Sequence, residues 1–132
     1  MAEGLSVALP LRIDEIDGAY GLNKDIITMA EQNLKMVVLT SPGERVMEPN
    51  FGVGVRRYLF EQNTPNLTGE IAARIRSQVK EYLPYINLKD VQVFSPSLHN
   101  DLMDKTTINI IIRYSIPAVN ISNKILTIPL VA

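Results

Sequence analysis

The hydrophobic pattern of this 132-residue chain changes once, at Pro84, from helical spacing to strict alternation. Before Pro84, apolar residues recur every three or four positions in two segments, and after it they alternate with polar residues, as is typical of β-strands. Helices that are separate from a run of antiparallel strands are typical of the α+β class. We therefore expect one α+β domain over residues 1–132, with two main helices packed on a small, mainly antiparallel C-terminal sheet. Residues 1–20 would form an N-terminal arm or a short strand.

Both helices are predicted from their apolar spacing and from the residues at their ends. Asn23 is a suitable N-cap for the first helix, and Ser41-Pro42-Gly43 ends it. The second helix would open at Thr64-Pro65 or at Thr68 and stop before Pro84. The faces expected to be buried are Ile26, Ile27, Ala30, Leu34, Val37 and Val38 in the first helix, and Ile71, Ile75, Val79 and Leu83 in the second.

Basic residues on the outer side of the second helix allow two interpretations. Arg74, Arg76 and Lys80 form either a solvated helix face or a contact with an acidic partner.

Three strands are expected after Pro84. The clearest is 107–116, in which Ile108 and every second residue after it share an apolar face. A strand that includes 90–95 precedes it, and the polar segment 95–105 would connect the two. The last strand is KILTIPLV, 124–131, and its Pro129 cannot donate to a ladder, so this strand should lie at a sheet edge or lose pairing near its end.

Composition excludes several classes of function. The formal net charge is −1, which gives no general attraction to nucleic acid or to an anionic membrane, so we expect neither partner. The absence of cysteine excludes disulfides and thiolate metal sites and fits assembly in a reducing cytoplasm. The only histidine, His99, lies in a polar segment, and we expect no cofactor and no metal site. No signal peptide or membrane span is expected from the apolar runs.

Residues 40–61 combine turn formers, paired charges and an amphipathic run, in the sequence TSPGERVMEPNFGVGVRRYLFE. Its succession of Pro42-Gly43-Glu44-Arg45, Pro49, Phe51-Gly52 and Leu59-Phe60-Glu61 resembles the small baseplate wedge proteins of contractile-tailed phages, historically labelled lysozyme-like. Relatives of that family occur in tailocins and type VI secretion machines. The resemblance implies a structural subunit that starts the sheath, not an enzyme.

The resemblance also implies a place and partners. The protein would lie in the tail baseplate of a virion, assembled in the host cytoplasm, or would be the equivalent subunit of a type VI secretion system or tailocin. Its partners would be other baseplate wedge proteins, the tail sheath protein and baseplate proteins near the tail tube. In this family the small domain is similar to the handshake domain of the sheath subunit, and arms of the first sheath ring add strands to its sheet.

Two groups of site residues follow from the resemblance. Many family members end the second helix with Glu-Pro-Arg as a docking point for the wedge, whereas this chain has Leu83-Pro84-Tyr85. Charges in the connecting segment would then give register to the docking contact, unless they are merely exposed. The wedge-docking candidates are Glu44, Arg45, Glu48, Pro49, Arg56, Arg57, Pro84 and Tyr85. The candidates for strand pairing with the sheath are Lys124, Ile125, Leu126, Thr127, Ile128 and Leu130, unless Lys124 and Pro129 only protect an ordinary edge.

A tail-associated peptidoglycan hydrolase is the alternative from another functional class. Glycoside hydrolysis needs two carboxylates across a cleft, one of them in an apolar pocket that keeps it protonated. Glu44 and Glu48 are the only close pair in this segment, and Arg45 beside them would favour ionised carboxylates. The chain also has no tryptophan to stack on a sugar.

Overall fold

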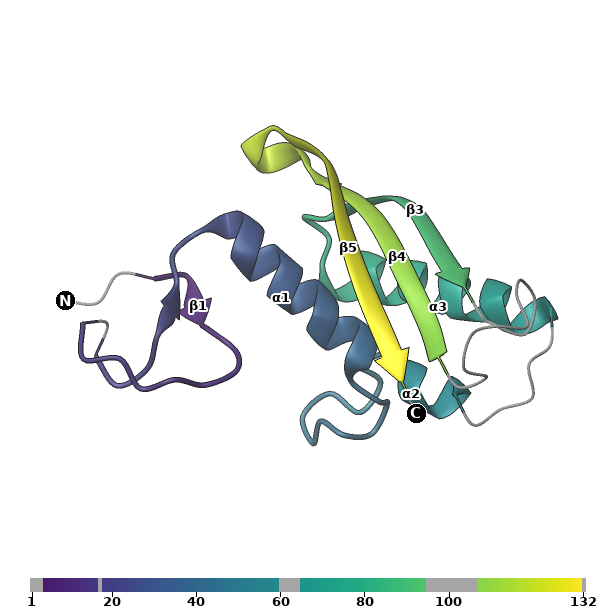
Figure 1. Ribbon diagram of the computed structural model, residues 1–132, viewed down its shortest axis with the longest axis horizontal. Coiled ribbons are helices and arrows are strands. Elements are labelled where there is room, and N and C mark those ends of the chain that lie inside the picture. Colours follow the sequence, from purple (N-terminus) through teal and green to yellow (C-terminus); the bar gives the residue numbers. More distant parts are fainter. Residues whose placement is uncertain (1–3, 17, 60–64, 95–106, 132) are drawn as a thin grey trace. The chain divides into compact units, whose positions relative to one another are not determined.

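A computed structural model of the protein describes residues 4–16, 18–59, 65–94 and 107–131 (Figure 1). The described chain groups into an N-terminal unit, Met1–Lys35, and a C-terminal unit, Met36–Ala132. The element order is β1 (Ser6–Val7), β2 (Leu22–Asn23), α1 (Ile26–Leu39), α2 (Val55–Tyr58), α3 (Pro65–Tyr82), β3 (Asn87–Phe94), β4 (Thr107–Ile116), the 3-10 turn η2 (Pro117–Val119) and β5 (Ile121–Val131). The α+β class is confirmed, while the single domain over 1–132 stays a prediction.

The N-terminal unit is organised around the side chain of Gln32. β1 and β2 form a two-residue antiparallel ladder, with Ser6 opposite Asn23. Gln32 Oε1 accepts from Leu9 N–H at 2.9 Å and from Asn23 Nδ2 at 2.8 Å. Gln32 Nε2 donates to Val7 O at 3.0 Å. One amide on α1 therefore ties together both strands and the segment after β1.

The prediction that Asn23 caps the first helix is wrong. α1 begins at Ile26, and Asp25 is the cap, because its Oδ1 accepts from Ile27 N–H at 3.3 Å and its backbone O from Met29 N–H at 3.1 Å. Asn23 lies in β2 and directs its amide to Ser6 Oγ at 3.1 Å. The predicted buried face is otherwise confirmed in the residues Ala30, Leu34, Val37 and Val38, with Ile26 and Ile27 half-buried.

The C-terminal sheet has the strand order β3-β4-β5, with both neighbours antiparallel. The predicted core face of β4 is confirmed, and in its central row Ile112 lies between Val91 on β3 and Leu126 on β5. β5 begins three residues before the predicted start at 124, because η2 and Asn120, which has a φ of 54°, reverse the chain within a few residues. The predicted connection 95–105, which includes His99, lies outside the described residues.

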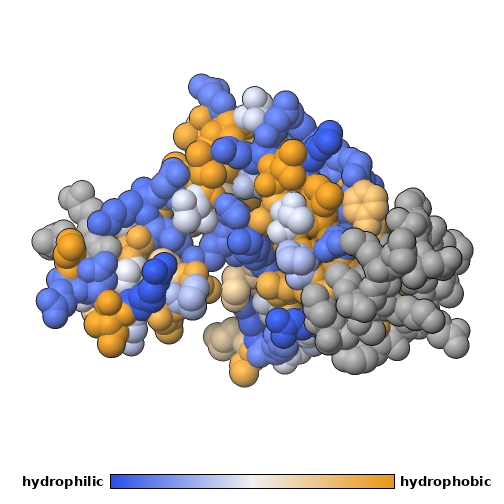
Figure 2. All heavy atoms as spheres, viewed as in Figure 1, coloured by the Kyte–Doolittle hydropathy of each residue, from blue (hydrophilic) through white to orange (hydrophobic). Residues whose placement is uncertain are grey.

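α3 covers the core face of this sheet and lies behind it in Figure 1. The predicted stripe of Ile71, Ile75, Val79 and Leu83 is buried, and the helix ends at Tyr82, two residues before Pro84. The opposite face of the sheet is mixed in character. In Figure 2, which views that face, hydrophobic and hydrophilic side chains are interspersed.

Candidate functional site

The segment between α1 and α2, residues 41–54, has no helix or strand of its own, and we call it the connecting loop. Its backbone nevertheless closes on itself, because Gly43 N–H donates to Pro49 O at 2.8 Å and Phe51 N–H donates to Glu48 O at 3.1 Å. Glu44 N–H donates to Ser41 O at 3.1 Å. The predicted docking residues between Gly43 and Pro49 are therefore presented from a backbone with defined turns.

Gln78 attaches the connecting loop to α3. Its buried side chain accepts from Gly52 N–H through Oε1 at 2.9 Å and donates from Nε2 to Asn50 O at 3.3 Å. The loop approaches the end of α1 so closely that a methyl group at Gly52 would collide with the carbonyl oxygen of Thr40. Gly52 also has a φ of +105°, so glycine is required here for both space and conformation.

An aromatic contact joins the charged part of the loop to the end of α3. The Arg45 guanidinium lies 3.9 Å from the centroid of the Phe51 ring, and Phe51 meets Tyr82 edge-to-face with centroids 4.9 Å apart. Arg45 also lies 4.0 Å from the Glu48 carboxylate. Partial burial, followed by the carboxylates of Glu81 and Glu48, raises the pKa of the Tyr82 phenol. Loop and helix end therefore form one continuous surface.

The other wedge-docking candidates are distributed over two elements. Pro84 is exposed and Tyr85 is half-buried in the turn that follows α3, next to the Phe51–Tyr82 contact in sequence. Arg56 and Arg57 are exposed on α2, where the Arg57 guanidinium lies 5.3 Å from the Tyr58 ring centroid. The structure thus brings Arg45 and Glu48 to the end of α3, and places the two arginines on a separate helix.

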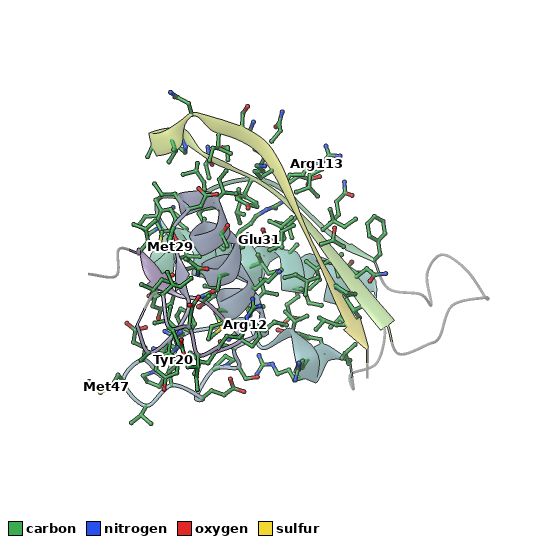
Figure 3. All side chains as sticks on the ribbon, turned by 60° about the vertical axis from the view of Figure 1, so that its left-hand side comes forward. Arg12, Tyr20, Met29, Glu31, Met47 and Arg113 are labelled. Carbon is green, nitrogen blue, oxygen red and sulfur yellow. The ribbon has the colours of Figure 1, made fainter. Side chains whose placement is uncertain are left out.

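Two adjacent apolar side chains project from the tip of the connecting loop. Val46 is 95% exposed and Met47 is 92% exposed, although exposed charged residues flank them on both sides (Figure 3). The sequence analysis did not identify this pair. Its exposure was indicated only by its position between Arg45 and Glu48, in a segment without helical or strand periodicity. Protruding apolar residues ringed by charges are typical of the centre of a protein interface.

The sheet edge at β5 has a defined direction because of Pro129. Pro129 is paired with Asn109 of β4, and since proline has no N–H to donate, its nitrogen must face away from β4. Alternation along an antiparallel ladder then directs the N–H groups of Thr127 and Ile125 to the open side as well. The predicted strand-pairing residues therefore fall into two groups. Ile125 and Thr127 have N–H groups on the open side, whereas Leu126, Ile128 and Leu130 point into the core and pair with β4.

The carboxylates considered for hydrolysis do not lie in an apolar pocket. The Glu48 side chain is 52% exposed beside Arg45, and Glu44 is exposed. Over the described residues, no cluster of three or more metal-ligating acidic, histidine or cysteine side chains occurs. In the same part of the chain, no helix has the length and apolar character needed to cross a membrane.

A second feature missed from the sequence lies in the N-terminal unit. Large apolar residues alternate with other residues and are exposed. They are Leu5, Val7, Leu9, Leu11 and Ile13. The period of two was the available signal, and it runs without interruption from Leu5 to Ile13, with Pro10 at one of the intervening positions.

Comparison with solved structures finds this fold in contractile machines. At 20% identity and a TM-score of 0.67, a protein of Geobacter sulfurreducens named as a candidate tail lysozyme matches 84% of this chain and 95% of its own. A chain of the anti-feeding prophage baseplate matches at 25% identity and a TM-score of 0.67, over 83% of this chain and 82% of its own. A chain of a type VI secretion baseplate complex matches at 14% identity and a TM-score of 0.56, over 81% and 93%.

Two sequence comparisons complete these findings. A search of curated proteins finds no significant match. The family model of baseplate wedge protein gp25 matches residues 29–120, which include most of α1, the connecting loop, α2, α3 and the first two strands of the C-terminal sheet. This chain therefore belongs to the baseplate wedge protein gp25 family and is a structural subunit of a contractile tail baseplate.

Proposed function

We propose that this subunit docks on other wedge proteins and starts the sheath by pairing a strand with an arm of the sheath protein. Docking would use the connecting loop together with α2 and the turn at Pro84-Tyr85, and strand pairing would use β5. The protein has a structural and not a catalytic role, and it is assembled into the baseplate from the host cytoplasm. Membrane and nucleic acid are not among its partners.

The open edge of β5 is the observation that carries this proposal. β5 is an eleven-residue edge strand, and β3, the other edge of this sheet, has eight residues. An incoming strand needs donors and acceptors that point outward, and Pro129 determines that Ile125 and Thr127 supply them. Both side chains are exposed, so an arm could pair here without disturbing the core.

Replacing Thr127 with proline tests strand pairing directly. Thr127→Pro removes one outward N–H and leaves the ladder to β4 intact, so the protein should fold and enter baseplates but start few sheaths. Thr127→Ala, which keeps the N–H, is the matched control. The measurement is the number of sheathed tails by electron microscopy after mixing baseplates with sheath protein. Normal sheath formation by the proline variant would refute pairing at this edge.

Wedge docking is tested at the tip of the connecting loop. Met47 and Val46 together offer the apolar centre of a contact, and Arg45 and Glu48 offer a charged rim. Met47→Asp should strongly reduce retention in purified baseplates, because a charge would be buried in the contact, whereas Thr28→Asp on the exposed face of α1 should not. Equal retention of both variants would remove the loop tip from the docking surface.

Catalysis is tested separately by a peptidoglycan zymogram. The exposed carboxylates beside Arg45 lack the environment of a general acid, so no clearing is expected. Clearing by the parent protein that Glu48→Gln abolishes would establish a hydrolase.

A further inference from the structure

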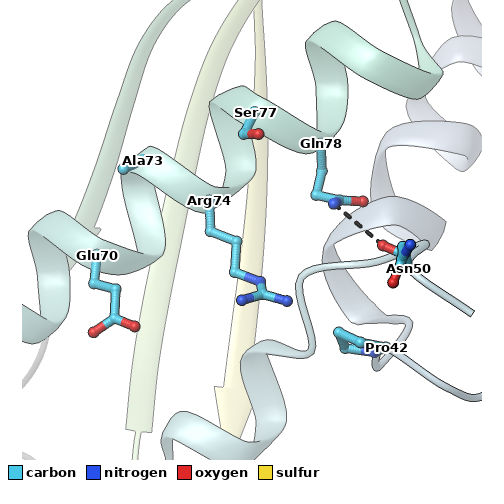
Figure 4. Close-up of a pocket in the computed structure, with 7 residues that line it drawn as sticks. All are labelled: Pro42, Asn50, Glu70, Ala73, Arg74, Ser77 and Gln78. Atoms are coloured by element: carbon cyan, nitrogen blue, oxygen red, sulfur yellow. Dashed lines mark hydrogen bonds between the residues drawn. The ribbon is translucent and has the colours of Figure 1, made fainter.

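A pocket with several polar side chains in its wall lies between α3 and the connecting loop, within the C-terminal unit (Figure 4). Its volume is about 450 Å³, enough for the end of a side chain from another molecule. Pro42 and Asn50 of the loop form one wall. Arg74, Ser77 and Gln78 of α3 form the other.

Arg74 is the group in this pocket that the protein itself leaves without an acceptor. Its Nε is shielded from solvent and has no hydrogen-bond partner. Among the described residues, no carboxylate lies within ion-pair distance of its guanidinium, and Figure 4 shows the side chain directed toward the loop while Glu70 points elsewhere. A shielded donor without an acceptor is costly, and more so on a charged group. An acceptor from outside the chain would remove this cost.

The neighbouring polar groups restrict what the acceptor can be. Both ends of the Gln78 amide are bonded to the loop backbone, so the other side chains of the pocket that can donate to an entering group are those of Arg74, Ser77 and Asn50. Donors that include a positive charge select an anion. Glu70 lines the same pocket and would repel a dianion more than a monoanion.

We propose that this pocket receives a carboxylate side chain of another protein chain, bound by Arg74. A small rotation of the guanidinium would let Nε and one terminal nitrogen hold both carboxylate oxygens, the side-on form of an arginine–carboxylate pair. The Ser77 hydroxyl would donate to one of the oxygens. The identification of the chain that supplies this carboxylate as a baseplate subunit rests on the proposed function. Of the two interpretations for the basic residues of α3, acidic contact applies to Arg74, while Arg76 and Lys80 are exposed.

The pocket can be tested without knowing the partner, by titrating the labelled protein with propionate, a monoanion that corresponds to a glutamate side chain. NMR should show a saturable shift of the Arg74 Nε–H and Gly52 N–H signals, with a Kd on the order of 10 mM for one charge-assisted contact. Arg74→Gln should weaken this binding about tenfold or more, and Arg76→Gln on the same helix should leave it unchanged. Propionamide, which has the same shape without charge, should not bind.

Two results of this titration would overturn the proposal. One is the absence of a saturable shift at these signals, and the other is an equal response to propionate and propionamide. Thermal unfolding of Arg74→Gln shows whether the variant is folded. Arg74→Lys is a second test of the side-on pair, because lysine keeps the charge but cannot make that pair.

Retention in baseplates tests the identity of the partner. Arg74→Gln should be retained about tenfold less than Arg76→Gln in purified baseplates, whereas Thr127→Pro, which alters only the sheath step, should be retained normally. If propionate binding is lost but retention is unchanged, the partner is not a baseplate chain. Failure of Thr127→Pro to affect sheaths would count against strand pairing and leave the pocket untouched.

Discussion

The two units of this chain differ in how far their apolar side chains are buried. In the C-terminal unit, the isoleucines of α3 and the core face of β4 are almost fully buried. In the N-terminal unit, Ile13 is 85% exposed and Ile16 is 88% exposed, and the polar side chain of Gln32 holds the backbone at Val7 and Leu9. The C-terminal unit is therefore stabilised by its own core, whereas the N-terminal segment leaves large apolar side chains exposed.

This difference fits a subunit that becomes complete only in an assembly. Soluble monomers rarely expose continuous apolar patches, and such patches mark interaction sites. In the proposed function the C-terminal unit presents the connecting loop and the edge of β5, and its buried core would hold both in place. The following changes test whether the stabilities of the two units differ as their burial indicates.

The largest effect is expected from the centre of the sheet. Ile112 is fully buried between Val91 and Leu126, so Ile112→Ala should lower the free energy of unfolding by about 2–5 kcal/mol by leaving a cavity. Chemical denaturation measures it. The control is Arg113→Ala on the exposed face of the same strand, which should change stability by less than about 0.5 kcal/mol. Equal losses would mean that this face is not the core.

A smaller but substantial effect is expected where the connecting loop meets α1. Gly52→Ala should cost about 3 kcal/mol, because the added methyl collides with the Thr40 carbonyl and the positive φ is strained. Gly43 also has a positive φ but no atom within 4 Å of an added methyl, so Gly43→Ala should cost only about 1–2 kcal/mol. Thermal and chemical unfolding of the two variants separate collision from backbone strain. Equal costs would show that the close approach is not required.

The attachment of the loop to α3 should contribute less. Gln78→Met keeps the length of the side chain but leaves Gly52 N–H and Asn50 C=O without their partner, at a cost of about 2 kcal/mol. Hydrogen exchange should show that the Gly52 amide loses protection while the amides of β4 do not. Gln92→Met, on the exposed side of β3, is the control and should leave the protection of the Gly52 amide and of the β4 amides unchanged.

Sequence periodicity predicted the C-terminal unit well for a physical reason. A sheet with one wet face imposes alternation, and a helix lying on it imposes a stripe, so β4 and α3 were recognisable from residues such as Ile110 and Ile75. The N-cap of α1 could not be recognised from the sequence, because Asn23 and Asp25 are both good N-cap residues and lie two positions apart. Contacts of Asn23 with Ser6 and Gln32, far away in the sequence, decided between them. α2, with four residues, was too short to show any period.

The candidate site was predictable only in part. The charged residues of the connecting loop stand out because turn formers surround them, but their attachment to α3 does not. A glutamine such as Gln78 in an amphipathic helix normally faces water, and its partner Gly52 is 26 residues away. Likewise, no pattern distinguishes the partly buried Arg74 from the exposed Arg76 on the same helix.

The smallest effect on overall stability, and the sharpest test of the difference between the units, is expected from Gln32→Ala. The change removes three hydrogen bonds that hold Val7, Leu9 and Asn23. The bonds to Val7 and Leu9 are exposed to water and only the bond to Asn23 is partly buried, so unfolding should shift by less than about 1 kcal/mol. Hydrogen exchange should nevertheless show a clear loss of protection at Leu9. Glu31→Ala, which breaks only the exposed pair with Lys35 at 3.3 Å, should leave that amide unchanged. A loss of global stability as large as that of Ile112→Ala would contradict the view that the N-terminal segment is held locally, because the segment would then have to be part of the cooperative core.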